Sequence, residues 1–381
     1  TGDPDAPLMT LTTDSSGQTP IVELPAPALA LSLEPSPSEQ PYSEYNISVT
    51  AKGYEPVLVT GSEILADELS LQPIRMNPLE MTEEEEKIVV IPAHTLFAEY
   101  PPKIPEDEIK PMAETGEIVL SRVVIPEYII VHDGVPSDST APNYWVRYKD
   151  YIKNVASCEI YSTWPESSLY ANILAILSFT LNRVYTEWYR NQGYDFTITS
   201  STAYDQKWVY GRNIYENIDV LVDTIFANYL SRPGVRQPIL TSYCDGQRVT
   251  CAGLSQWGSK YLGDEGYSAI EIIRYYFGND MYINTAEMIS GVPSSWPGYD
   301  LTIGSAGEKV LQLQNQLNRI ARNYPAIPAI AADGIYGPAT AEAVRTFQGI
   351  FNLPQTGVTD YATWFEISDI YVGVTRIAEP D

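Results

Sequence analysis

Residues 158–165 read Cys-Glu-Ile-Tyr-Ser-Thr-Trp-Pro and lead directly into a long amphipathic segment. Pro165 sets the backbone dihedral that a first helical turn needs. Apolar residues then recur at helical spacing until Gly193, which predicts a helix over about residues 166–192. These apolar positions are Leu169, Ile173, Ile176, Leu177, Leu181, Val184, Tyr185 and Trp188.

Glu159 lies just ahead of this helix among apolar and aromatic neighbours. Burial there would raise the pKa of its carboxyl group, because desolvation disfavours the charged form. A carboxylic acid that is protonated near neutral pH can donate a proton to a leaving group. The alternative is an ordinary polar residue at the end of a strand.

The composition limits the classes of function. At 381 residues the chain is long enough for two to four domains. Its formal net charge of -26 argues against partners such as nucleic acid or anionic membrane surfaces, whose binders are usually basic. Residues 1–122 contain 22 acidic and 6 basic residues, so the N-terminal third carries most of this charge.

Metal and cofactor chemistry finds little support in the residue types. The only two histidines, His94 and His132, are far from each other in the sequence and from any cysteine pair. We therefore predict no metal site, no cofactor and no Ser-His-Asp triad. Cys244 and Cys251 are close in sequence, and a disulfide, two thiols and a metal pair all remain open, with reduced or merely structural cysteines favoured.

The chain divides into four parts with a multidomain α+β fold. Residues 1–77 alternate as β-strands, as in Tyr45–Thr50 and Val57–Thr60 with a turn at Lys52-Gly53, and resemble a β-sandwich of the carboxypeptidase-regulatory, transthyretin-like type. Residues 78–125 form an acidic, Pro-rich connector. It is either a plain linker or a propeptide that is cut near residues 120–123.

Residues 126–295 mix strands with helices, the latter predicted over about 166–192, 214–231 and 268–277, without βαβ regularity, which favours an α+β domain. Residues 300–372 read as three helices. Between the first two lies Asp333-Gly334-Ile335-Tyr336-Gly337-Pro338-Ala339-Thr340, where glycines permit a tight turn and Thr340 can cap the next helix.

This C-terminal segment resembles the peptidoglycan-binding domain of the first type. The matching positions are Leu301, Gly304, Val310, Leu313, Gln314, Leu317, Asp333, Gly334, Tyr336, Gly337, Thr340, Ala343, Val344, Phe347 and Gln348. The resemblance implies a wall-binding module in which the turn offers backbone groups, and Tyr336 a stacking face, to a sugar or stem peptide.

The central block resembles the SpoIID/LytB domain. Glu159 and Pro165 with the Ala-rich helix, Asp205-Gln206 with Tyr210-Gly211, and Gly253-Leu254-Ser255-Gln256-Trp257-Gly258 follow that family's signatures. The family commonly has a histidine shortly before the glycine of the last signature, and residues 249–252 contain none. A role for that histidine is therefore not carried over.

The resemblance implies a lytic transglycosylase with Glu159 as its catalytic acid. Such an enzyme needs one carboxyl group, which protonates the glycosidic oxygen and then accepts the proton of the sugar's own C6 hydroxyl. Substrate-binding candidates are Trp164, Asp205, Gln206, Tyr210, Ser255, Gln256 and Trp257. We expect Asp205, in a loop beside Gln206, to be a hydrogen-bonding or structural residue rather than a second acid.

The order of the four parts is similar to that of the clostridial spore-cortex-lytic enzymes. This similarity implies a zymogen outside the cytoplasm, in the spore cortex or cell wall, with cortex peptidoglycan as substrate and a subtilisin-like germination protease as activating partner. Two alternatives are an N-acetylmuramoyl-L-alanine amidase and a non-catalytic cortex-binding protein. An amidase is less favoured because a zinc triad is missing from the sequence.

Overall fold

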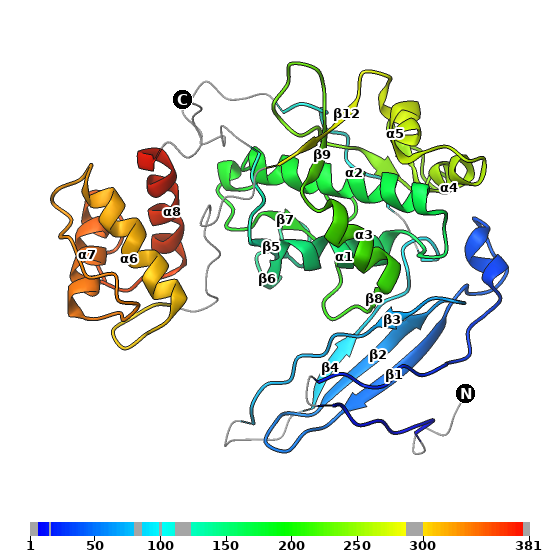
Figure 1. The fold of residues 1–381 in the computed structure, drawn as a ribbon, viewed down its shortest axis with the longest axis horizontal. Coiled ribbons are helices and arrows are strands. Elements are labelled where there is room, and N and C mark those ends of the chain that lie inside the picture. Colours follow the sequence, from blue (N-terminus) through cyan, green and yellow to red (C-terminus); the bar gives the residue numbers. More distant parts are fainter. Residues whose placement is uncertain are drawn as a thin grey trace.

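The computed structural model describes residues 7–14, 17–79, 86–98, 101–110, 123–286 and 300–375. Figure 1 shows an N-terminal sheet, a central mixed block and a C-terminal helical bundle, so the predicted α+β class is confirmed. None of the described helices is long and apolar enough to cross a membrane. The predicted cleavage stretch 120–123 lies outside the described residues except for Val123, which is buried.

The N-terminal part is a single three-stranded sheet in the order β1-β2-β4 (Ser43–Val49, Val57–Ile64 and Lys87–Val90). β1 and β2 pair antiparallel, and β4 joins β2 in parallel. The described residues of this part contain no second sheet packed on the first, unlike the predicted sandwich. Its remaining short elements are the 3-10 helix η1 (Leu29–Leu33) and β3 (Ser70–Leu71).

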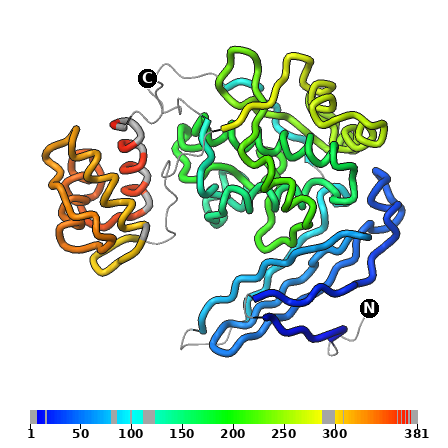
Figure 2. Tube along the Cα trace, viewed as in Figure 1, coloured from blue at the N-terminus to red at the C-terminus, as the bar shows by residue number. Residues whose placement is uncertain are grey.

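β3 pairs instead with β8 (Ile214–Tyr215) of the central block. Tyr42, Leu65 and Leu96 are buried in the same hydrophobic cluster as the central helices. The tube in Figure 2 passes from the N-terminal sheet into the central block. The N-terminal third therefore contributes to the main core, and the described connector residues 86–98 and 101–110 pack against the block, unlike a plain linker.

Helix α2 (Glu166–Tyr185) is the buried centre of the middle block. A helix that is apolar on most sides must be covered all round. The elements that contact α2 are α1 (Tyr148–Glu159), α3 (Glu216–Ile225), α4 (Gln256–Asp264), α5 (Ala269–Phe277) and β9 (Asn228–Ser231). Other strands are β5 (Tyr128–His132), β6 (Asn143–Arg147), β7 (Ile198–Thr199), β10 (Tyr243–Cys244), β11 (Leu254–Ser255) and β12 (Tyr282–Thr285).

Several predicted boundaries change. The helix predicted over 166–192 ends at Tyr185, and the 3-10 turn η2 (Arg190–Gln192) follows before Gly193 adopts a left-handed conformation. The helix predicted over 214–231 is divided into β8, α3 and β9. α5 agrees with the prediction for 268–277, with a capping box between Ser268 and Glu271.

The C-terminal bundle consists of α6 (Glu308–Ala321), α7 (Pro338–Ile350) and α8 (Tyr361–Thr375), as predicted. It has its own hydrophobic cluster, in which Leu313, Leu317, Phe347 and Trp364 are fully buried. A separate core of this kind allows the bundle to fold as a unit of its own.

Candidate active site

Glu159 is the last residue of α1 rather than the end of a strand. Its side chain is fully buried. Oε1 accepts a hydrogen bond from the backbone N–H of Lys207 at 2.7 Å. Oε2 is buried and has no hydrogen bond of ordinary geometry to any described residue. Oε1 of the carboxyl group is thus fixed by a backbone N–H, and the Tyr243 hydroxyl lies near the same group.

Burial raises the pKa of the Glu159 carboxyl group. The positive charge of Lys103, the backbone N–H of Lys207 and the nearby Tyr243 hydroxyl all lower it, but desolvation is the largest influence and the pKa remains raised. The protonated acid is therefore favoured to a higher pH than in an exposed glutamate. This is the state that a general acid needs.

Lys103 of the connector extends into this site. Its Nζ donates to the backbone carbonyl of Asp205 at 2.6 Å and lies 4.1 Å from the centre of the Tyr243 ring and 5.3 Å from that of Phe179. Burial lowers the pKa of the ammonium group, while Glu159 and Asp205 raise it. A connector cation thus acts electrostatically on the predicted acid.

Asp205, a substrate-binding candidate that we expected to be structural, makes buried hydrogen bonds through both carboxylate oxygens. Its Oδ1 accepts from Arg183 Nε at 2.7 Å, and its Oδ2 accepts from the Tyr189 hydroxyl and from the backbone N–H and hydroxyl of Thr199. All these groups are buried. With both oxygens engaged, this carboxylate is not placed to serve as a second acid or base.

Gln206 is also committed to the core. Its Oε1 accepts from the hydroxyls of Tyr151 and Thr180, and its Nε2 donates to the Ile176 carbonyl. The candidate assignment of Gln206 to substrate therefore needs correction, because no polar atom of its buried side chain is left over.

Trp164 and Trp257 need the same correction. They are buried, with ring centres 4.8 Å apart, and Tyr161 contacts both rings edge-on. Trp164 Nε1 donates to the carbonyl of Ser32 in η1. Neither indole presents an open face to a sugar, because each is packed in the core.

The remaining candidates of the central block differ in their surroundings. Ser255 is the N-cap of α4 and accepts from the Gly258 N–H at 2.9 Å. The Tyr210 hydroxyl accepts from Lys87 Nζ at 2.6 Å. Gln256 is buried, and neither its Oε1 nor its Nε2 has a hydrogen-bond partner among the described residues. Ser255 and Tyr210 are therefore engaged in hydrogen bonds within the fold, and the Gln256 amide is not.

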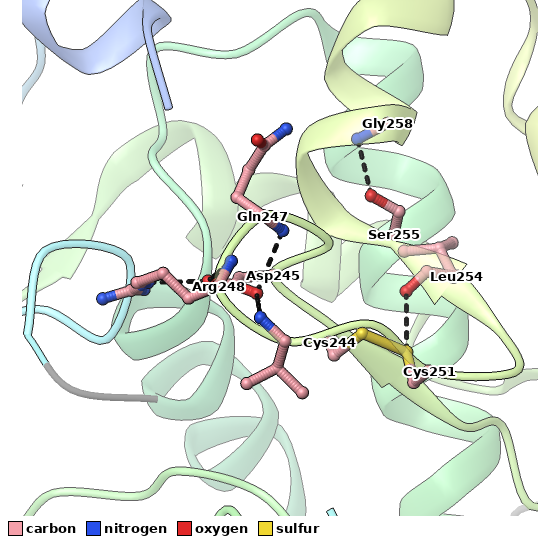
Figure 3. The surroundings of a disulfide bond; sticks show 9 residues. Cys244, Asp245, Gln247, Arg248, Cys251, Leu254, Ser255 and Gly258 are labelled. Atoms are coloured by element: carbon pink, nitrogen blue, oxygen red, sulfur yellow. Dashed lines mark hydrogen bonds and ion pairs between the residues drawn. A yellow bond between two sulfur atoms is a disulfide. The ribbon is translucent and has the colours of Figure 1, made fainter. Parts of the chain in front are cut away.

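Cys244 and Cys251 form a disulfide (Figure 3). The reduced state favoured from sequence is therefore wrong. Asp245 caps the loop between them, accepting from the backbone N–H groups of Gln247 and Val249 and from Arg248 Nε. Arg248 also donates to the carbonyls of connector residues Thr95 and Ala98. The loop thus attaches the connector to the central block.

Connector residues 101–110, which we call the strap, bind along the same region. The Ile104 N–H donates to the Ala203 carbonyl at 2.8 Å. Glu106 pairs with Arg183 through two hydrogen bonds of 2.6 and 2.9 Å, and Glu108 pairs likewise with Arg232 at 2.7 and 2.8 Å. Two bidentate pairs, one at Glu106 and one at Glu108, therefore hold the strap on the central block.

In the C-terminal module, Tyr336 is fully buried, so it offers no stacking face. Its hydroxyl donates to the Gly357 carbonyl and is hydrogen-bonded to the Thr359 hydroxyl. Ile335 is exposed instead. Asp333 accepts from Gln314 Nε2 and the Ile335 N–H, and Gly334 takes a positive φ of 74°.

Gly337, not Thr340, is the N-cap of α7. The Thr340 hydroxyl accepts from Gln314 Nε2 inside the module. The predicted turn is therefore held by hydrogen bonds within the module. The side chain that it exposes is Ile335, whereas the expected one was Tyr336.

Sequence reasoning missed Lys103 and Tyr243 as site residues. Tyr243 directly precedes Cys244, so its position beside the cysteine pair was a usable signal. Lys103 lies between Pro102 and Ile104 in a Pro-rich stretch, and its sequence carries no sign of the contact. Within the described ranges, no group of three or more His, Cys, Asp or Glu side chains is arranged to hold a metal ion.

Residues 306–365 match the family described as "Putative peptidoglycan binding domain", which confirms the resemblance of the C-terminal part. The "Zinc D-Ala-D-Ala carboxypeptidase" of Streptomyces albus G is 43% identical over 74 residues, 19% of this chain and 27% of that protein. The chain thus spans about a quarter of this curated relative. "The crystal structure of SleB N-terminal domain" is 28% identical, with a TM-score of 0.18, over 20% of this chain and 97% of that one.

Proposed function

We propose that this protein acts on bacterial peptidoglycan, in the cell wall or spore cortex, and that the C-terminal module holds it there. The family match of residues 306–365 supports this proposal. Ile303 and Ile335 are exposed in this module. Their chain neighbours Gly304 and Tyr336 are joined by a backbone hydrogen bond, so both isoleucines lie next to the turn. The central block would then work on wall polymer held close by.

We further propose that the central block cleaves the bond between muramic acid and glucosamine as a lytic transglycosylase. The observation that carries this proposal is the Glu159 carboxyl group, which is buried, has a raised pKa and accepts a backbone hydrogen bond at Oε1 alone. Asp205 is fully bonded, so a two-carboxylate hydrolysis mechanism finds no second acid there. A transglycosylase needs only one.

In this reaction Glu159 gives its proton to the glycosidic oxygen, and the electron pair of the breaking C1–O bond stays with that oxygen. The C6 hydroxyl oxygen of the muramic acid then forms a bond to C1, and its proton returns to Glu159. The products are a free hydroxyl end and an anhydro end, and no water is consumed. Lys207 N–H holds Oε1 throughout, so Oε2 carries the proton.

We also propose that the chain is a zymogen of the cortex-lytic kind, activated by a subtilisin-like germination protease that cuts the connector. The contacts of the strap with Ala203, Arg183 and Arg232 support this, because they place connector residues across the Glu159 region. The two alternatives, an amidase and a non-catalytic cortex-binding protein, remain as outcomes of the test.

The test is product analysis by mass spectrometry after incubating cortex peptidoglycan with full-length protein cut in the connector. We expect anhydromuramic ends, and their loss in Glu159→Gln by about 10²–10⁴-fold, the usual contribution of a general acid. Glu216→Gln, an exposed carboxylate on α3, is the matched control. Free stem peptides would indicate an amidase, and pelleting with the wall without released sugars would indicate a binding protein.

A further inference from the structure

The surroundings of the Lys103 ammonium group have the features of a cation site. The Asp205 carbonyl accepts from it at 2.6 Å, the Tyr243 ring faces it at 4.1 Å, and the charge of Glu159 acts on it. Each of these groups belongs to the central block, whereas the cation comes from the strap. A positive charge is costly in a dry pocket unless such groups compensate it.

The proposed reaction develops a positive charge of its own. As the glycosidic bond breaks, the sugar ring becomes oxocarbenium-like. An enzyme accelerates a reaction by binding this state more tightly than the substrate. A carbonyl oxygen and an aromatic face beside the catalytic acid are suited to that charge, since both attract cations in a low-dielectric site.

We propose that Tyr243 is a further catalytic residue of this site: its ring face stabilises the positive charge on the sugar, and Lys103 occupies that place until the strap leaves. This inference rests on the proposed function. In the uncut chain the strap would then block the site in two ways: it fills the space, and the Lys103 ammonium group takes the place of the positive charge on the sugar. Its bidentate pairs, Glu106 with Arg183 and Glu108 with Arg232, hold Lys103 in position.

The experiment uses full-length Lys103→Ala, which leaves a hole of the shape of the lysine side chain. n-Butylammonium chloride is titrated into it and followed by calorimetry, with n-butanol as the neutral probe. We expect the ammonium ion to bind Lys103→Ala and not wild type, and butanol to bind far more weakly. Lys87→Ala is the matched control, because Lys87 lies over the Tyr210 ring, a different tyrosine.

The role of Tyr243 is read from double variants. Lys103→Ala/Tyr243→Phe keeps the ring, so we expect ammonium binding within about threefold of Lys103→Ala, whereas Lys103→Ala/Tyr243→Leu should lose about tenfold or more. If the leucine variant unfolds, pentafluorophenylalanine at position 243 keeps the shape and reverses the charge of the ring face. Equal binding with and without the aromatic face would overturn the inference.

Activity gives the second measurement. Uncut Lys103→Met should release anhydro ends where uncut wild type does not. In that background, Tyr243→Leu should have a turnover rate at least tenfold below that of Tyr243→Phe, which keeps the ring face and removes the hydroxyl beside Glu159. Ammonium binding without anhydro ends would refute the proposed function and leave the cation site. Anhydro ends without ammonium binding would refute this inference alone.

Discussion

At the scale of one residue, Glu159 is a buried carboxyl group whose desolvation costs stability. Its carboxyl group is buried with only one oxygen hydrogen-bonded to a described backbone group. A structural carboxylate such as Asp205 has both oxygens bonded. Groups left in this state are typical of functional sites, because the open valence is what the substrate uses.

The first prediction concerns the pH dependence of stability. The folded pKa of Glu159 lies above its unfolded value of about 4.3. Between the two, the folded state holds a proton that the unfolded state has lost, so the free energy of unfolding falls as pH rises. Glu159→Gln removes this loss. We expect it to be more stable than wild type at pH 7 and equal to it below about pH 4, by thermal unfolding across pH. A difference that does not vary with pH would contradict this.

The second prediction concerns Asp205→Asn, which is chemically the same kind of change. Here the amide leaves the buried Arg183 guanidinium without one of its carboxylates. Loss of one partner of a buried pair costs about 3–5 kcal/mol, so this variant should unfold at a markedly lower temperature at pH 7. The paired comparison with Glu159→Gln separates the two roles, and similar effects of both variants would argue against the assignment.

At the scale of an element, the loop closed by Cys244 and Cys251 joins two parts of the fold. The disulfide spans a sequence separation of 7, and Arg248 within the loop binds the carbonyls of Thr95 and Ala98. Because Gly246 has a positive φ and its α-carbon lies against Ser255, the loop also packs on the start of α4. Opening the disulfide would therefore loosen the connector as well as the loop.

The third prediction is that Cys244→Ser/Cys251→Ser lowers stability by about 2–3 kcal/mol, the loop-closure entropy for so short a ring. Reducing agent should lower the unfolding temperature of wild type by a similar amount and leave the double variant unchanged, because its remaining thiol, Cys158, is unpaired. Differential scanning calorimetry with and without dithiothreitol measures both. An equal response of the two proteins would mean that the disulfide is not the cause.

Some elements could be predicted from the sequence and others could not. The apolar periodicity of α2 and of the C-terminal helices predicted them, because burial on one or more faces leaves that signal. Helix α1 was missed although Tyr148, Tyr151, Ile152 and Val155 have helical spacing. The site needed more than periodicity. The contacts of Lys103 with Asp205 and Tyr243 join distant parts of the chain and leave no local pattern.

At the scale of the whole molecule, the N-terminal third is tied to the central block by a buried ion pair. Arg212 Nη1 donates to Glu63 Oε1 at 3.1 Å, both side chains are about 1% exposed, and Asn213 bonds the Glu63 backbone at both its N–H and its carbonyl. Such a pair is costly to break, because the remaining charge stays buried. The strap, by contrast, is held by pairs whose carboxylates are partly exposed, with Glu106 at 16% and Glu108 at 35%.

This difference leads to the fourth prediction, that cutting the connector frees the strap without releasing the N-terminal part. The two fragments of protein cut between residues 111 and 122 should elute together in size-exclusion chromatography. Deleting residues 1–122 should instead expose the main core and give an unstable product. Glu63→Gln should cost about 3–5 kcal/mol and weaken fragment association, while Glu44→Gln, on the exposed side of the neighbouring strand β1, should change stability by less than about 0.5 kcal/mol. Separation of the wild-type fragments under native conditions would show that the buried pair does not hold them together.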